Sequence, residues 1–538
     1  MSKRKHAIDA YFSRATQLHA AGRLPEAEQA YRQILAAAPT HADSRHMLGV
    51  LALQAGHPEG ALAEIDQAIS LRPAAAMFHV NRANALLATN RPDDAIAASR
   101  QALHYKRNAA EAMQTLGRAL SDLGRADEAV TAYQGGLQMN PLLRDLHNDL
   151  GLALHDASRP EEAAGAFAEA LRRTPGDPLT MGNLAGALKD IGRLTDAEQI
   201  YRDILRADPN NATAHFNLGV LLLLAGRFAE GWREWEWRFR ADPAITRSFP
   251  PPAWQGEPLA GRTLLIYGEQ GLGDMIQFSR FLPLVADLAG HGGKVVLEIH
   301  RPLARLLVQL PGPASVTPIG EPLPRFDLHC PLMSLPRLLG IDREADIPAT
   351  VPYLRADSAL VAPWQEKLLP FKGLRVGLVW SGGPDRVRLD RRRSIPVELL
   401  AGLAAVPGIT LVSLQKGAVA SHWPGTALDG AMHDWTDMLG DFADTAALVE
   451  CLDLVISVDT AVVHLAGALG KPVWLLNRAD TCWRWMLGRD DSPWYPTLRQ
   501  FRQERAGAWE PVIARMTEAL ASFASTVPPD RRTEPRAG

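Results

Sequence analysis

Four loops in the C-terminal half of this chain hold the residues best suited to chemistry. Each follows a short apolar run that predicts a β-strand, and the loops are Gly268–Asp274, Ser381–Gly383, Gln415–Gly417 and Val458–Ala468. In parallel α/β sheets, ligands bind at the carboxyl ends of the strands, where helix N-termini offer N–H groups to anions. We therefore expect the four loops to converge on one cleft that binds an anionic ligand.

The first loop combines three glycines with two carboxylates. Gly268, Gly271 and Gly273 let the backbone turn tightly and approach a ligand, while Glu269 and Asp274 supply the acids. The spacing fits neither the G-x-G-x-x-G of dinucleotide sites nor the G-x-x-x-x-G-K-[ST] of phosphate-binding loops. An NAD-dependent oxidoreductase and a nucleoside triphosphatase are therefore disfavoured. Alone, the loop is equally consistent with a functional site and with a tight structural turn.

The fourth loop places polar residues where a strand ends and a helix begins. Asp459 and Thr460 lie at that junction, and His464 follows one helical turn later. Thr460 would cap the helix and, with the Ala461 N–H, could hold a phosphate. The alternative for Asp459 and Thr460 is capping alone, and for His464 a buried histidine packed under the loop.

Strands alternating with helices must position these loops. Strands are predicted at Thr263–Tyr267, Lys294–Ile299, Val316–Ile319, Asp327–Cys330, Arg375–Trp380, Thr410–Leu414, Leu454–Ser457 and Pro472–Leu476. Helices are predicted at 275–289 and near 509–523, and residues 525–538 are predicted to be a disordered tail. The alternation indicates parallel sheets, and a break near 356–373 divides them into two facing Rossmann-like βα domains.

The N-terminal half consists of seven consecutive 34-residue units that run from Ile8 to about Ile245 in one register. Small residues fill the eighth and twentieth places of each unit, and a proline ends six of the seven units, with Arg107 at the remaining place. Small residues suit the crossing of two helices, and proline suits the end of the second helix. This period resembles that of tetratricopeptide (TPR) repeats, which predicts an all-α solenoid.

A solenoid of this kind has an extended concave surface that ordinarily holds a peptide or a partner protein. The alternative is that it only spaces or dimerises the rest of the chain. Asparagines recur on the predicted first helices, at Asn81, Asn84, Asn148, Asn183 and Asn217. They could hydrogen-bond an extended backbone, or they could simply be a solvated helix face.

The last unit has an aromatic second helix instead of a polar cap. Trp232, Trp235 and Trp237 lie there, and Trp254 follows a proline-rich break at Phe249–Trp254. Aromatic side chains bury large areas and rarely crowd an exposed cap without a partner. We therefore expect this end of the array to dock on the next domain.

Composition narrows the class of partner and the compartment. The net charge of −3 and the absence of a long basic run make nucleic acid an improbable principal partner. The three cysteines share no close spacing, which argues against a zinc or disulfide framework and suits a reducing compartment. No apolar stretch follows the basic N-terminus or is long enough to span a bilayer, so we predict a cytoplasmic protein.

The C-terminal half also resembles a known family. The segments GEQGLGD, the arginine-rich stretch before Ser394-Ile395-Pro396, DFADTAALVECLDLVISVDTAVVHLAGALGKPVW and RWMLGRDDSPWYPTLRQFRQ are similar to bacterial TPR proteins whose C-terminal half is similar to glycosyltransferase family 9. That family comprises ADP-heptosyltransferases of the GT-B fold. The resemblance covers most of 262–520. It implies a nucleotide diphosphate sugar as substrate and a transferase that needs no metal cofactor.

The resemblance also implies roles for individual residues. Asp274 would be the catalytic base, Arg393 would neutralise the donor diphosphate in place of a family lysine, and Glu269, Gly271 and Gly273 would form the acceptor-side loop. Asp459, Thr460 and His464 match the family's donor-binding loop. The loops at the strand ends add further candidates for donor binding, namely Ser381, Gly382, Gln415, Lys416 and Ala461.

These observations predict a TPR array at 8–245, a short first GT-B-like domain at 262–355, a second nucleotide-sugar domain at 374–523 and a tail at 525–538. The predicted function is transfer of a sugar from a nucleotide diphosphate sugar to an acceptor, which could be a protein presented by the repeats. The alternative is a non-catalytic TPR adaptor with a degenerate GT-B domain, which the short first domain favours.

Overall fold

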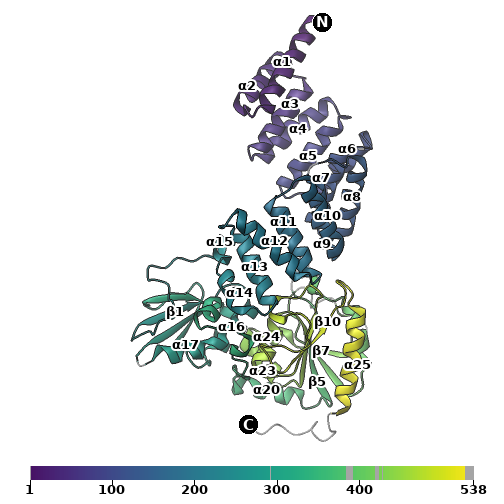
Figure 1. The fold of residues 1–538 in the computed structure, drawn as a ribbon. Coiled ribbons are helices and arrows are strands. Elements are labelled where there is room, and N and C mark those ends of the chain that lie inside the picture. Colours follow the sequence, from purple (N-terminus) through teal and green to yellow (C-terminus); the bar gives the residue numbers. More distant parts are fainter. Residues whose placement is uncertain are drawn as a thin grey trace. The chain divides into compact units, whose positions relative to one another are not determined.

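The computed structural model describes residues 2–143, 145–290, 292–382, 392–417, 423–426 and 428–526, with side chains from residue 6 onward. The chain divides into two compact units, Met1–Ala187 and Leu188–Gly538. Figure 1 shows helices throughout the first unit and both sheets in the second. Among the described residues, no helix is long and apolar enough to cross a lipid bilayer.

The first unit is an all-α solenoid of paired helices. Its helices are α1 (Ser2–Ala20), α2 (Leu24–Ala37), α3 (Ala42–Gln54), α4 (Pro58–Leu71), α5 (Ala76–Ala88), α6 (Pro92–Tyr105), α7 (Ala110–Asp122), α8 (Ala126–Met139), α9 (Leu146–Asp156), α10 (Pro160–Arg173) and most of α11 (Pro178–Asp190). Two helices per 34 residues confirm the predicted TPR solenoid.

The small residue at the eighth place of each repeat makes room for a large one on the partner helix. A Cβ added at Gly117 would lie 2.5 Å from the Tyr133 ring, and one added at Gly151 would lie 2.5 Å from the Phe167 ring. Both rings are buried. The column is therefore a position of close helix crossing, as predicted, and in these two repeats a ring fills the space, so a larger side chain would push the helices apart.

The turn between the two helices of each repeat requires a left-handed backbone, a feature that the sequence analysis did not identify. The residue at this place has a positive φ in all seven repeats, namely Gly22, Gly56, Asn90, Gly124, Ser158, Gly192 and Gly226. Glycine is favoured there because it has no Cβ to clash with the backbone.

The asparagines of the first helices link successive repeats. Asn81 Nδ2 lies 2.7 Å from His46 Nε2, and Asn183 Nδ2 donates to Asn148 Oδ1 at 3.0 Å. Asn84 Oδ1 accepts from the Thr115 hydroxyl at 3.1 Å. These four side chains therefore link neighbouring helices and are not a purely solvated face.

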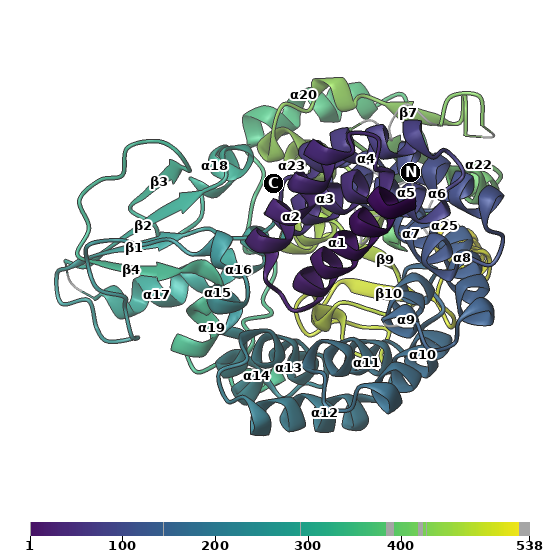
Figure 2. The same ribbon diagram turned by 90° about the horizontal axis from the view of Figure 1, so that it is seen from above.

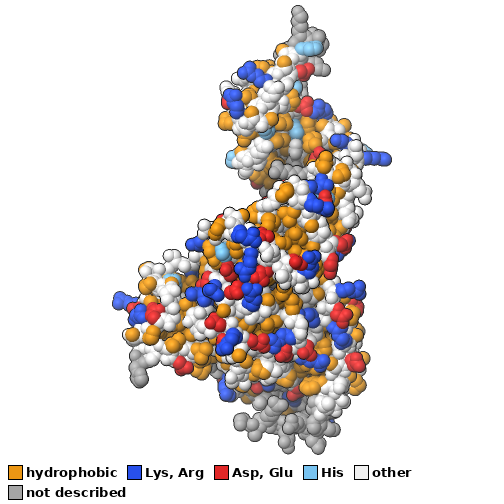
Figure 3. All heavy atoms as spheres, viewed as in Figure 1, with side chains coloured by type: hydrophobic (Ala, Val, Ile, Leu, Met, Phe, Trp, Pro, Cys, Tyr) orange, Lys and Arg blue, Asp and Glu red, His pale blue; other side chains and the backbone are white. Residues whose placement is uncertain are grey.

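The second unit begins with the last helices of the array and continues into two parallel sheets. The helices are α12 (Leu194–Ala207), α13 (Ala212–Leu224), α14 (Phe228–Trp235) and α15 (Arg238–Ala241). On the face shown in Figure 3, positive and negative side chains are interspersed over α12 to α14. Arg202 and Arg227 there pair with Glu198 and Glu230. This face therefore carries paired charges and not a basic surface.

The first sheet has four parallel strands in the order β3-β2-β1-β4. They are β1 (Thr263–Tyr267), β2 (Lys294–Ile299), β3 (Ser315–Pro318) and β4 (Leu328–Pro331), with α16 (Leu272–Phe278) after β1 and α17 (Leu282–Ala289), α18 (Arg301–Leu307) and α19 (Leu335–Leu338) beside the sheet (Figure 2). The helix predicted at 275–289 is broken at Ser279–Phe281, just before Pro283.

The second sheet has six parallel strands in the order β10-β9-β8-β5-β6-β7. They are β5 (Leu374–Val379), β6 (Ile409–Ser413), β7 (Met432–Asp434), β8 (Leu454–Val458), β9 (Val473–Asn477) and β10 (Leu498–Arg502), with α20 (Ser358–Leu368), α22 (Ala401–Ala404), α23 (Phe442–Glu450), α24 (Ala461–Ala468) and α25 (Glu510–Thr526). All eight predicted strands form, and the two edge strands β7 and β10 were not predicted. Of the predicted tail, Ser525 and Thr526 end α25, and the rest lies outside the described residues.

An aromatic cluster packs α14 against the part of the chain that carries the sheets, as predicted for Trp232 and Trp235. Trp232 and Trp235 are buried and lie 5.3 and 5.8 Å from the ring of Trp483, measured between ring centroids. Trp254 is also buried, and its N–H donates to the β4 residue His329. Trp237 instead stacks on His215 of α13, so it was wrongly assigned to the docking surface.

Candidate functional site

The carboxyl edge of the six-stranded sheet brings together the loops after β5, β6 and β8. Gln415, after β6, is buried, and its Oε1 accepts from the N–H groups of Trp380 and Ser381 at 3.1 and 2.8 Å. The Ser381 hydroxyl lies 2.9 Å from that of Ser394. Gln415 is therefore occupied in fixing the end of β5, while Lys416 beside it is exposed and donates to the Leu439 carbonyl.

Arg393 lies across two of these loops. Its Nη1 donates to the Asp459 carbonyl at 2.6 Å and its Nη2 to the Gly382 carbonyl at 3.2 Å. A Cβ on Gly382 would come within 1.9 Å of Arg393 Nε, so only glycine allows the guanidinium to lie this close to the backbone. The structure thus brings together three residues that the sequence analysis assigned to the donor site.

The helix that follows β8 starts at this edge without a side-chain cap. Thr460 occupies the N-cap position of α24, but its side chain makes no capping hydrogen bond. Its Oγ1 lies 3.1 Å from Ser457 Oγ instead. The expectation that Thr460 caps the helix is therefore wrong. The Val463 N–H donates to the Thr460 carbonyl at 3.1 Å, but no side chain caps the start of the helix. An uncapped helix N-terminus, with the Ala461 N–H at its start, suits an anion.

His464 is buried beneath this helix start. Its Nδ1 lies 3.0 Å from the Tyr495 hydroxyl, and its ring stacks on Trp485 at 5.3 Å. Burial, together with the charges of Arg484 and Arg280, holds the pKa of His464 well below 6.5. A neutral imidazole supplies no positive charge to a diphosphate, so the geometry favours the buried-histidine alternative over a donor-binding role.

Asp274 is tied at both carboxylate oxygens. It is the third residue of α16, and its Oδ2 accepts from the Gly271 N–H at 3.0 Å. Its Oδ1 accepts from Nη2 of Arg484, a guanidinium that is about nine-tenths buried. Asp274 therefore caps its own helix and also joins the first βα domain to the second.

The first loop meets the fourth at the starts of α16 and α24. A Cβ added at Gly273 would lie 2.8 Å from His464 Cδ2 and 3.4 Å from the Ala461 Cα. This close approach confirms that these two loops converge. Gly273 is needed for helix packing here, and no open space separates the two helix starts at this point.

Glu269 is buried and forms a bidentate ion pair with Arg238 of α15. Arg238 Nη2 and Nε donate to its two oxygens at 2.6 and 3.1 Å, and the Met333 N–H also donates to it. At the end of β2, buried Glu298 is paired in the same way with Arg247. Glu269 therefore anchors the last repeat, which argues against the predicted acceptor-side role.

Comparison with known proteins places these features in families. Tetratricopeptide repeat models match residues 9–33, 46–112, 115–178 and 154–215, and the model of glycosyltransferase family 9 (heptosyltransferase) matches residues 435–504. The chain therefore contains segments that match TPR repeats and one segment, residues 435–504, that matches the glycosyltransferase family 9 model. The chain is also 33% identical over 296 residues to Protein FlbA from Caulobacter vibrioides, covering 51% of this chain and 48% of FlbA, so it spans about half the length of that curated relative.

The repeats are similar to solved TPR structures. The TPR protein YrrB, described as having an unusual peptide-binding site, is 22% identical and covers 33% of this chain and 92% of its own, with a TM-score of 0.30. The Pseudomonas aeruginosa pilF protein is 23% identical and covers 38% and 92%, with a TM-score of 0.34.

The glycosyltransferase family 9 segment contains functional candidates that sequence reasoning missed. They lie in the 3₁₀ turn Trp483–Trp485, where Trp483 contacts Trp232 and Trp485 stacks on His464. Between them, Arg484 binds Asp274 and donates to Gln277 Oε1 at 2.7 Å. Three consecutive residues thus join three different elements. This turn follows β9, a strand that the sequence predicted, but the loop after that strand was not among the four loops considered.

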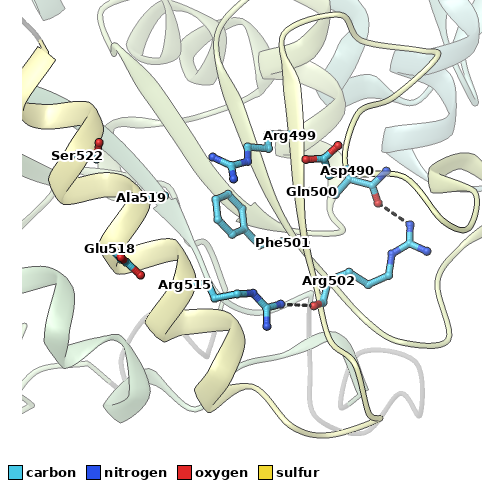
Figure 4. Close-up of a pocket in the computed structure, with 9 residues that line it drawn as sticks. All are labelled: Asp490, Arg499, Gln500, Phe501, Arg502, Arg515, Glu518, Ala519 and Ser522. Carbon is cyan, nitrogen blue, oxygen red and sulfur yellow. Dashed lines mark hydrogen bonds between the residues drawn. The ribbon is translucent and has the colours of Figure 1, made fainter.

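A pocket of about 520 Å³ lies elsewhere in this half, between β10 and α25 (Figure 4). Its lining includes Arg499, Phe501, Arg502 and Arg515, and none of the predicted site residues. Arg515 Nη2 donates to the Arg502 carbonyl at 2.7 Å, so part of its charge is already engaged. Within the described ranges no group of three or more His, Cys, Asp or Glu side chains is arranged to hold a metal ion.

Proposed function

We propose that this chain is a glycosyltransferase-like protein of GT-B type that transfers a sugar from a nucleotide diphosphate sugar to an acceptor. The observation that carries the proposal is Arg393, held against Gly382 and Asp459 beside the uncapped start of α24. A guanidinium and a helix N-terminus together suit a diphosphate. The match to glycosyltransferase family 9 supports the same ligand class.

In this proposal the second sheet binds the donor. Arg393 and the first N–H groups of α24 stabilise the departing diphosphate, a task that in other enzymes falls to a metal ion. The donor lies along the loops that carry Ser381, Gly382, Gln415, Lys416, Asp459, Thr460 and Ala461. Asp274 is the proposed base that takes the acceptor's proton, and Arg484 fixes its orientation.

The proposed acceptor is a protein or peptide presented by the concave face of the repeats in the cytoplasm. The carboxyl edge of the first sheet offers little alternative, because Glu269 and Glu298 there are already bound by Arg238 and Arg247. The short first sheet of four strands leaves acceptor recognition to the repeats.

A second candidate function, a non-catalytic adaptor, is favoured by one specific observation. Both oxygens of Asp274 are engaged, and α16 packs directly on α24 at Gly273. A carboxylate that serves as a cap and as an interdomain ion pair has to leave at least one of these partners before it can take a proton from an acceptor. In that case the GT-B-like half binds nucleotide sugar, or nothing, and the repeats alone carry the function.

The two candidates separate in one screen of the purified full-length chain. We expect thermal stabilisation by at least one nucleotide diphosphate sugar, with release of the nucleoside diphosphate when an acceptor is present. Thr460→Trp should remove the stabilisation by filling the start of α24, whereas Ser358→Trp, at the exposed start of α20, should not. Stabilisation without release in any acceptor extract supports the adaptor. No stabilisation by any donor contradicts the donor site.

A further inference from the structure

A chain of buried ion pairs joins the end of α11 to the proposed donor site. Arg392 Nη2 lies 3.4 Å from Asp190 Oδ2 and 2.7 Å from Asp480 Oδ2. Arg478 Nη1 lies 3.0 Å from the same Asp480 oxygen, and Lys189 Nζ lies 2.6 Å from Asp190 Oδ1. All of these groups belong to the second unit.

The burial of this cluster is unusual for so many charges. The side chains of Asp190, Asp480 and Arg478 are 3, 6 and 7% exposed, and that of Arg392 is 11% exposed. Desolvating charged groups is costly, and a buried ion pair is poor evidence for added stability. What such a pair does provide is a fixed geometry, because each charge has one low-energy place to go.

The geometry matters because Arg392 immediately precedes Arg393. Arg392 points to carboxylates from α11 and from the loop after β9, while Arg393 donates to the carbonyls of Gly382 and Asp459. Their Cα atoms are one peptide unit apart, about 3.8 Å. Anchoring the first guanidinium therefore limits where the second one can lie.

We propose that Asp190 and Asp480 are positioning residues for the donor diphosphate, acting through Arg392 to place Arg393. This inference rests on the proposed donor site and extends it to a residue of the repeat array. Asp190 ends the first helix of the sixth repeat, so the position of the Arg393 guanidinium depends on a residue of a TPR helix. The two carboxylates also decide which of the two neighbouring arginines faces the phosphates.

The test is isothermal titration of the full chain with inorganic pyrophosphate. We expect wild type to bind, and Asp190→Asn and Asp480→Asn each to weaken binding roughly tenfold, the worth of one charge-assisted hydrogen bond to the phosphate. Asp190→Glu should recover most of the affinity, because it restores the charge. Asp196→Asn, which removes an exposed carboxylate paired with Arg193, should change nothing.

A purely structural role for Asp190 predicts a different result. If Asp190→Asn does not fold, the double variant Asp190→Asn/Arg392→Gln removes the uncompensated buried charge, and we expect it to fold and still bind weakly. If that variant, or a folded Asp190→Asn, binds pyrophosphate with wild-type affinity, the inference is overturned. The donor site itself then still stands, provided that Arg393→Gln abolishes pyrophosphate binding. No binding by wild type overturns the donor site and the inference with it.

Discussion

The carboxyl edges of the two sheets both carry charged side chains, but the charges differ in sign and in their partners. At the first sheet, Glu269, Glu298 and Asp274 are each bound by an arginine from elsewhere in the chain. At the second sheet, Arg393 and Lys416 donate to backbone carbonyls and the start of α24 has no side-chain cap. The carboxylates of the first edge therefore bind the last repeat and the second βα domain. The second edge is the one suited to an anionic ligand.

This difference changes the meaning of a carboxylate after a strand. In an isolated GT-B domain, acids at the first edge would be candidates for acceptor binding or catalysis. Here Arg238 and Arg247, from the end of the repeat array and the segment after it, bind two of these acids. The end of the repeat array is thus part of the structure of the first βα domain.

The largest expected effect tests whether the first edge keeps one catalytic group. Asp274→Asn should lower turnover by roughly 10²–10⁴-fold, the usual size of a general-base contribution. Because this change also removes the counter-charge of Arg484, the matched variant is Arg484→Gln, which breaks the same ion pair and keeps the carboxylate. Equal losses in the two variants, measured as single-turnover rates, would mean that the ion pair only holds the domains together.

The next prediction tests whether the Arg238–Glu269 ion pair at the first edge stabilises the fold. Arg238→Gln leaves Glu269 buried without a counter-charge and should lower the free energy of unfolding by about 3–5 kcal/mol. All 13 tryptophans lie in the second unit, so tryptophan fluorescence in urea reports on this unit alone.

Two further variants serve as controls. Arg240→Gln, on the same short helix, should shift the free energy by less than about 0.5 kcal/mol. The double variant Arg238→Gln/Glu269→Gln should recover most of the loss. A loss below about 1 kcal/mol in Arg238→Gln would contradict the anchoring role.

The smallest effect concerns the second edge and pH. His464 stays neutral in the folded protein because burial lowers its pKa, whereas the unfolded chain takes up a proton below pH 6.5. The unfolded state then binds more protons, so stability falls as the pH falls, by about 1.4 kcal/mol per pH unit for this group. We therefore expect the free energy of unfolding, measured by urea denaturation between pH 7 and 5, to depend on pH less steeply in His464→Gln than in wild type, by about 1.4 kcal/mol per pH unit. An unchanged slope would mean that His464 is charged in the folded protein.

Local pattern predicted most of the fold and only part of the site. The 34-residue period and eight strands follow from apolar spacing, which is a local property of the chain. The column of left-handed turn residues could have been predicted from the five glycines in it. It was missed because two repeats have a different residue at this place, Asn90 and Ser158. Edge strands such as β10 escaped because their pattern is short and mixed with charge.

The site residues that escaped prediction depend on distant partners. Nothing in the loop Gly268–Asp274 indicates that Glu269 will meet Arg238 or that Asp274 will meet Arg484, 210 residues later. Gly382 and Asp459, which the sequence places at strand ends, meet at Arg393 because the topology of a parallel sheet determines where strand ends lie.

The central claim is that a nucleotide diphosphate binds at the second edge and not at the first. Hydrogen–deuterium exchange of the full chain with and without ADP, UDP and GDP tests it directly, with Thr460→Trp as the control. We expect protection in the peptides that carry Gly382, Arg393 and the start of α24, and no protection in Thr460→Trp. Protection confined to the Gly268–Asp274 loop would contradict the account, because it would place the nucleotide at the edge whose carboxylates are already paired.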